Sequence, residues 1–178
     1  MGLCMLFSCQ KDPVDIYFED KPVYFDMNGF IRGQIVNLKG RGFGLRKREE
    51  KDGFARTIEK EKVDWEAELA DFLECDINRP AWRDRFETDT VLRNESTLVI
   101  RHTSSVPECP MRNMVVTYDR GSGTCLKVSI EKHTDNFLFT SDQHLFFTTG
   151  EGYSVHSKLE VNWLFSSEYE VESRFIEI

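Results

Sequence analysis

Histidines and carboxylates are the residues of this sequence best suited to bind a metal. The acidic residues Glu168, Glu170 and Glu172 share one face of a predicted strand, but no Asp-x-Asp-x-Asp-Gly calcium loop accompanies them. The histidines fall on separate predicted strands, without His-x-His or His-Glu-x-x-His spacing, so a metal site would have to be assembled across a sheet. They are His102, His133, His144 and His156. We therefore expect a solvated acidic face, no metal site and no cofactor.

Nucleophilic chemistry has equally little support. No Gly-x-Ser-x-Gly elbow is present, and Cys75 could act as a nucleophile only beside a histidine, so a small buried residue is the simpler interpretation. The glycines of 40–44 lack a following Walker lysine and indicate a loop. No Cys-x-x-Cys pair occurs among the cysteines, which excludes a zinc ribbon or a thioredoxin motif. They are Cys4, Cys9, Cys75, Cys109 and Cys125. We predict no catalytic residues.

Cys9 carries the most specific signal in the chain. The segment Leu6-Phe7-Ser8-Cys9 resembles a bacterial lipobox, with leucine three residues before the cysteine and a small residue directly before it. The resemblance implies lipidation of Cys9, a signal-peptide remnant and tether over 1–20, and a lipid-anchored place in the cell envelope, on the periplasmic side or the outer surface. Because eight residues are short for a signal peptide, we expect the true start codon to lie upstream.

Two other interpretations of the N-terminus stay open. The segment 1–9 is also compatible with a frayed terminus that carries an incidental cysteine. Gly2 and Cys4 are typical of eukaryotic dual acylation, although Leu6 stands where the myristoylation pattern has serine or threonine.

Length, charge and composition narrow the class of protein. The chain has 178 residues, 40% of them hydrophobic and 30% charged, which is typical of one globular domain. Its formal net charge of −8 argues against nucleic acid or an anionic membrane surface as the main partner, because polyanions attract lysine and arginine. It contains no run of about 18 apolar residues that could span a membrane.

Alternating apolar and polar residues predict the sheet. From Tyr153 to Trp163 the apolar residues share one parity, and the same period of two recurs at Leu126–Ile130 and Tyr169–Phe175. Short turns at 119–123, 149–152 and 166–167 would join these runs into an antiparallel meander. Polar residues at 141–143 suggest a bend or bulge within one long strand.

Two helices should cover this sheet. Asp26 caps a predicted helix that ends at Gly40, and Asp64 caps another whose apolar stripe runs to Ile77. Charged hairpin arms surround Gly53, and a second hairpin turns near Asn94. We predict an α+β fold: an antiparallel β-meander of about nine strands, strongly twisted or partly closed, with two helices packed on one face. Residues 21–178 form its single domain.

Three segments resemble uncharacterised small lipoproteins of the Bacteroidota. They are Phe25-Asp-Met-Asn-Gly-Phe, the segment Val63-Asp-Trp to Pro-Ala-Trp82, and Asn136-Phe-Leu-Phe-Thr-Ser141. The resemblance covers nearly the whole chain. It implies an envelope location and brings no established activity with it.

Three functions remain as hypotheses. The first is a non-enzymatic envelope lipoprotein, anchored to the membrane through Cys9, that presents a binding or scaffolding surface to an unknown partner, either a protein or a small apolar ligand. The second is a carrier whose barrel or cup encloses a small apolar ligand among Phe137, Phe139 and Phe147. The third is a hydrolase with a site assembled across strands. If the protein is exported, the remaining cysteines 75, 109 and 125 are an odd number, so at least one is free or pairs between chains. The hairpin expected near Gly121 sets Tyr118 opposite Cys125, which argues against a Cys109–Cys125 bridge.

Overall fold

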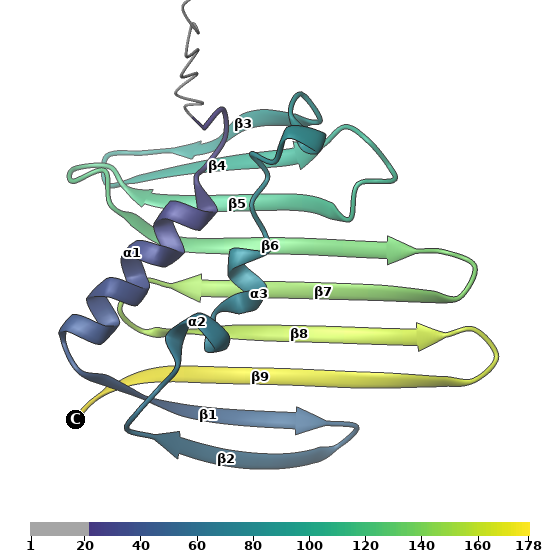
Figure 1. Cartoon of the computed structure of the whole chain (residues 1–178). Coiled ribbons are helices and arrows are strands. Elements are labelled where there is room, and N and C mark those ends of the chain that lie inside the picture. Colours follow the sequence, from purple (N-terminus) through teal and green to yellow (C-terminus); the bar gives the residue numbers. More distant parts are fainter. Residues whose placement is uncertain (1–21) are drawn as a thin grey trace, which may run out of the picture.

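One antiparallel sheet is the main element of residues 22–178, as the alternating sequence pattern predicts. The computed structural model describes residues 22–178, and within this range the sheet has nine strands (Figure 1). The strands are β1 (Phe43–Lys51), β2 (Phe54–Lys60), β3 (Phe86–Arg93), β4 (Thr97–Ser104), β5 (Met111–Asp119), β6 (Cys125–Asp135), β7 (Phe139–Thr148), β8 (Gly152–Val161) and β9 (Phe165–Glu177). The α+β class and the antiparallel sheet are therefore confirmed.

The strands follow one another in space from β3 to β9, and the N-terminal hairpin then joins the far side. The order is β2-β1-β9-β8-β7-β6-β5-β4-β3, with β1 paired antiparallel to β9 from Phe43↔Glu177 to Lys51↔Tyr169. The prediction of partial closure is wrong, because the sheet stays open with β2 and β3 as its two edges. The β2 edge carries Arg56, Glu59 and Lys60, and such charges oppose further strand pairing.

The first predicted helix is confirmed as α1 (Met27–Gly40). Its N-cap is Asp26, whose carboxylate accepts a hydrogen bond of 2.8 Å from the backbone N–H of Gly29. The buried side chains recur every three or four residues, which puts them on one side of the helix. They are Met27, Ile31, Ile35 and Leu38.

The second predicted helix is broken, so the expectation of two full helices is wrong. The segment forms α2 (Trp65–Glu68) and α3 (Ala70–Leu73), and a 3₁₀ turn η1 (Pro80–Trp82) follows. Between α2 and α3 the backbone of Leu69 leaves the helical conformation, at φ −104° and ψ 16°. Leu69 is fully buried and the neighbouring Glu68 bonds to Lys47 on β1, so packing onto the sheet outweighs helical regularity here.

Aromatic side chains hold the helical segments to one face of the sheet (Figure 1). Phe147 on β7 is fully buried, and its ring lies 5.6 Å from that of Phe30 on α1 and 5.7 Å from that of Phe72 on α3. Trp65 on α2 lies 5.5 Å from Phe175 on β9. Contacts of this kind fix helix positions through both buried area and ring geometry.

The turn expected at Ser166-Ser167 lies elsewhere. Both serines belong to β9, and the chain reverses at 162–164, where Trp163 adopts a positive φ of 67°. The backbone N–H of Asn162 donates to the carbonyl of Leu138, so the neighbouring hairpin fixes the position of this turn. Trp163, expected to be buried in a strand, is fully exposed at the tip.

The bend expected at 141–143 is also absent. The pairing of β7 with β6 runs without interruption from Thr148 to Thr140, and that with β8 from Thr148 to Phe139. Asp142 faces His133 on β6 and accepts a hydrogen bond of 2.6 Å from its ring, so polar partners across the strands replace apolar ones. No helix among residues 22–178 is long and apolar enough to cross a bilayer.

Replacing Phe147 tests how far stability depends on the helix-covered face. The Phe147→Ala variant should lose about 3–5 kcal/mol of unfolding free energy, because the cavity is enclosed by three aromatic neighbours. Its sequence neighbour Phe146 points to the opposite face and is 39% exposed, so Phe146→Ala should cost no more than about 1 kcal/mol. Urea denaturation followed by circular dichroism measures both, and equal losses would contradict this assignment of faces.

Candidate functional site

The two faces of the sheet differ sharply in chemistry. Helices cover the face that holds Leu45, Phe147 and Phe175, whereas no element of the described chain covers the other, which we call the open face (Figure 1). The strand register assigns a polar layer to the open face. Its central rows are Ser129, Phe146, Ser154, Glu172 and Arg48, then Lys127, Thr148, Gly152, Arg174 and Arg46.

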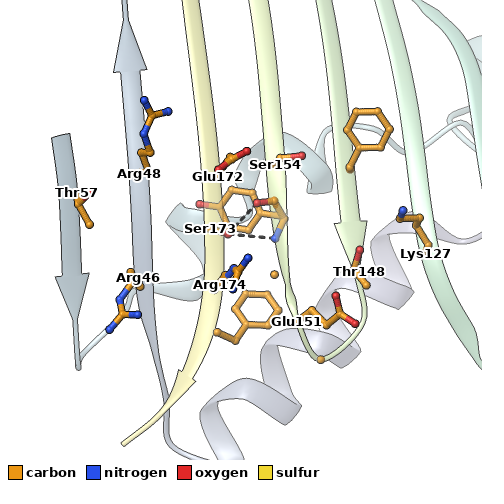
Figure 2. A pocket seen from close by; sticks show the side chains of 15 residues that line it. Arg46, Arg48, Thr57, Lys127, Thr148, Glu151, Ser154, Glu172, Ser173 and Arg174 are labelled. Carbon is orange, nitrogen blue, oxygen red and sulfur yellow. Dashed lines mark hydrogen bonds between the residues drawn. The ribbon is translucent and has the colours of Figure 1, made fainter. Parts of the chain in front are cut away.

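A shallow depression of about 810 Å³ lies on this face, beside the turn between β7 and β8 (Figure 2). Four cationic side chains from three strands line it: Arg46, Arg48, Arg174 and Lys127. Two carboxylates, Glu151 and Glu172, line it as well. The local balance is therefore basic in a protein whose formal net charge is −8.

Gly152 creates room within this layer. It pairs with Thr148 on one side and with Arg174 on the other, so it interrupts a row of side chains that crosses the sheet. A Cβ built on Gly152 would lie 2.1 Å from the carbonyl oxygen of Ser173, a distance that backbone atoms cannot accommodate. The gap between Thr148 and Arg174 is therefore a requirement of the backbone.

The four cations differ in their partners. Arg46 bonds to Glu59 at 2.5 Å and Arg48 to Glu50 at 2.5 Å. Among residues 22–178, Arg174 and Lys127 have neither an ion-pair partner nor a hydrogen-bonded acceptor for their side chains. Arg174 is next to Gly152 in the row, Lys127 lies on the other side of the gap beyond Thr148, and both have free capacity to bind an anion.

The histidines are closer together than the sequence indicates. His144 and His156 stand directly opposite each other on β7 and β8, with Glu131 and Glu170 as their outer neighbours in the same row. His133 lies on the same open face and bonds to Asp142. Within the described range no group of three or more histidine, cysteine or carboxylate side chains is arranged to hold a metal ion. The acidic residues that the sequence assigned to a solvated face, Glu168, Glu170 and Glu172, are all exposed.

His102 belongs to the helix-covered face instead. Its ring is buried and lies 2.8 Å from the hydroxyl of Thr88 on β3, and its ring also packs against Tyr24. Burial lowers the pKa of His102, so it is neutral near pH 7. It is a structural residue of the core.

The three described cysteines are free, buried thiols. Cys75 is fully buried on the helix side, and its Sγ donates to the carbonyl of Asp71. Burial raises the pKa of Cys75 and of Cys125 to about 12, so both remain protonated. The interpretation of Cys75 as a small buried residue is confirmed, and Cys109 and Cys125 form no bridge.

A charged cluster that the sequence did not reveal joins α2 to β1. The Nζ of Lys47 lies 2.7 Å from Glu68 and 3.0 Å from Glu49, and the hydroxyl of Tyr153 donates to Glu68. Only 12% of the Lys47 side chain and 8% of the Glu68 side chain are exposed. The only signal in the sequence was Lys47 at an apolar parity of its strand, next to Leu45.

Hydrogen bonds and opposite charges within this cluster favour the charged forms of Glu68 and Lys47. Burial alone would raise the pKa of Glu68, but hydrogen bonds from Lys47 and Tyr153 and the charges of Lys47 and Lys60 hold it below its ordinary value. Burial would lower the pKa of Lys47, yet hydrogen bonds to Glu68 and Glu49 raise it. Burial and the bond to Glu68 raise the pKa of Tyr153. The cluster thus holds α2 onto the sheet with every charge paired.

The sequence also predicted a lipidation site and a set of aromatic residues that would enclose a ligand. Cys9, the predicted lipidation site, lies outside the described residues. Of the aromatics assigned to a ligand cavity, Phe147 is in the packed core, whereas Phe137 is 90% exposed at a hairpin tip. These two side chains therefore do not line a common cavity, and the open sheet encloses none of the expected barrel interior.

The Glu68 cluster predicts a pH dependence of stability. Because the folded-state pKa of Glu68 lies below the ordinary value of 4.5, its contribution is complete above that pH and is lost as the pH falls through the folded-state pKa. Glu68→Gln should cost about 1–3 kcal/mol at pH 7 and flatten the loss of stability below pH 4.5. Urea titrations between pH 3 and 7 check this, with Glu95→Gln on an exposed turn as control. Parallel curves for wild type and Glu68→Gln would contradict it.

The chain matches no protein-family model and no curated protein, and no solved structure matches it.

Proposed function

We propose that this protein is a non-enzymatic binding protein of the cell envelope, whose open face receives a ligand with more than one anionic group. The observation that supports the proposal is the pair of unpartnered cations, Lys127 and Arg174, on either side of the Gly152 gap. A sheet face that is polar, uncovered and rigidly supported from behind provides a binding surface without a moving part.

The charge distribution favours an anion. Lys127 offers ammonium donors and Arg174 offers the planar donor fork that matches phosphate and carboxylate oxygens. Arg46 extends the row of Arg174 toward β2 and Arg48 lies in the adjacent row, and the carboxylate partners of both can be exchanged for ligand oxygens at the surface. The backbone at Gly152 allows a ligand to approach the sheet closely between these side chains.

The size of the depression favours a ligand larger than one phosphate or one carboxylate. Its volume of about 810 Å³ is comparable with sites for small organic ligands. Its mixed lining, with Glu151 and Glu172 beside the cations, would orient such a ligand rather than attract any polyanion. Phosphate and carboxylate groups share this chemistry, so both a free polyphosphate and an acidic peptide fit it.

Location completes the proposal. Lipidation of Cys9 would hold the domain at a membrane surface, with residues 10–20 as the tether, as the lipobox resemblance implies. The resemblance to lipoproteins of the Bacteroidota supports the same location. An anchored domain needs no steering by its own net charge to reach that surface, so the acidic composition is compatible with it.

Binding of two defined anions tests the site. Isothermal titration of the full chain with inorganic pyrophosphate and with a hexaglutamate peptide should show binding of at least one, with weaker affinity at higher salt. The Lys127→Ala/Arg174→Ala variant should lose at least tenfold in affinity, because both free cations are removed. Pyrophosphate binding alone would assign a phosphate ligand, and peptide binding alone an acidic protein partner.

The control removes the same charge elsewhere. Lys62 and Arg93 are exposed and do not line the depression, so Lys62→Ala/Arg93→Ala should keep wild-type affinity. If both double variants lost the same affinity, the loss would be due to the change in net charge and not to the depression. Absence of wild-type binding to either anion would remove the anion site.

Acyl labelling tests the anchor separately. With the gene and its upstream codons expressed in a bacterial host that is fed a tagged fatty acid, the wild-type protein should carry label and partition with membranes. Cys9→Ala should lose both, because the acylated sulfur is gone. Label that persists in Cys9→Ala, or membrane partitioning unchanged by it, would contradict lipidation at this residue.

A further inference from the structure

Five large apolar side chains project from two neighbouring turns at one end of the sheet. Four of them lie in the turn between β6 and β7 and in the turn between β8 and β9, and the fifth is the first residue of β9, at the end where Figure 1 shows both hairpins reversing beyond the helices. We call them the tip patch: Phe137, Leu138, Trp163, Leu164 and Phe165. Their exposed fractions are 90%, 65%, 102%, 78% and 55% in that order.

The two turns are held together by hydrogen bonds. The backbone N–H of Asn162 donates to the carbonyl of Leu138 at 3.1 Å, and its side-chain amide donates to the carbonyl of Phe137 at 2.9 Å. Asn136 caps its own turn by accepting from the backbone of Leu138 at 2.9 Å. The apolar side chains of both tips therefore form one ordered surface rather than two independent loops.

Exposing these apolar side chains to water is unfavourable, and the turns could form without them. Turns are ordinarily built from glycine, asparagine, aspartate and serine, and contiguous exposed apolar patches mark interaction sites. Trp163 occupies a left-handed position, φ 67°, where asparagine or glycine would be less strained. Neither packing nor backbone geometry explains a tryptophan here.

The position of the patch at two hairpin tips favours a lipid bilayer as its partner over a second folded protein. Its five side chains lie at the ends of two neighbouring hairpins that extend beyond the helices, so all of them can enter a fluid phase together. A stable protein complex buries about 800 Å² on each partner and needs matched shapes. A lipid bilayer needs no complementary shape, and tryptophan is enriched at its interface because the indole is apolar with one polar N–H.

The charged residues beside the tip patch indicate which lipid headgroups it favours. Asp135 and Glu160 are exposed on the strands that lead into the two tips, and Glu160 already binds the nearby Lys158 at 2.6 Å. With Glu160 paired to Lys158 and Asp135 negative, these residues contain no excess of cations that would favour anionic lipids. We propose that the tip patch inserts into the interfacial region of a bilayer with zwitterionic headgroups. This insertion is independent of an acyl chain on Cys9.

Vesicle binding by unlipidated protein tests the proposal. The full chain carrying Cys9→Ala, mixed with phosphatidylcholine vesicles, should float with them, and its tryptophan emission should shift to the blue. Trp163 is the source of that shift, because Trp65 is only 2% exposed and Trp82 is partly buried already. Adding Phe137→Ser and Trp163→Ser should lower the vesicle-bound fraction at least tenfold. Val36→Ser, at a 71% exposed position of α1 away from the tips, should leave it unchanged.

Three results would overturn the proposal. The first is the absence of vesicle binding by the Cys9→Ala protein, whatever the result of acyl labelling. The second is binding that appears only when phosphatidylglycerol replaces part of the phosphatidylcholine. The third is concentration-dependent dimerisation in sedimentation that the tip variant abolishes, which would assign the patch to a second copy of the chain.

Discussion

Everything in this fold depends on covering one apolar face of a wide, open sheet. Strands with alternating apolar and polar residues bury one side and leave the other in water, and the buried side of nine strands needs a second layer. Here that layer is thin: one 14-residue helix and two short helical segments of four residues each. Large side chains such as Trp65, Phe72 and Phe147 make up for the small number of helical turns.

The pairing of β1 with β9 is the second constraint, because it brings the N-terminal part of the chain to its C-terminal strand. It puts Lys47 beneath α2, where Glu68 and Tyr153 complete a partly buried charge cluster. Loss of Lys47 would leave Glu68 with only the more distant Lys60, and loss of Glu68 would leave Lys47 with Glu49 alone, in a poorly solvated place. The cluster therefore makes the position of α2 specific in a way that apolar contacts alone do not.

The open face and the tips gain their properties from the same one-sided construction. Because the helices support the sheet from behind, the polar rows across β6, β7, β8, β9 and β1 keep a fixed spacing without a cover. The hairpins extend beyond the helical layer, so their turn residues meet solvent on every side (Figure 1). A binding surface on the face and an apolar patch at the end are thus separate regions of one rigid element.

Local sequence patterns were sufficient to predict most strands and α1, whereas contacts between distant segments set how these elements are arranged. Period-two alternation, the Asp26 cap and the turns around Gly53 and Asn94 are local signals, so the strands and α1 could be predicted from neighbouring residues. The pairing of β1 with β9 joins residues 118 to 134 positions apart, from Lys51↔Tyr169 to Phe43↔Glu177, and no local pattern records it. The same holds for the basic depression, whose cations come from separate strands.

The incorrect predictions have the same origin. The predicted helix from 64 to 77 breaks at Leu69 because tertiary contacts of Glu68 and Leu69 outweigh helix propensity. Trp163 matches the apolar parity of its strand, but a hydrogen bond between hairpins sets the turn at 162–164 instead of 166–167 and leaves Trp163 exposed. Alternation along a strand predicts which face of the sheet a residue occupies only as far as the strand extends. The point at which a strand ends depends on contacts with neighbouring segments in the folded structure.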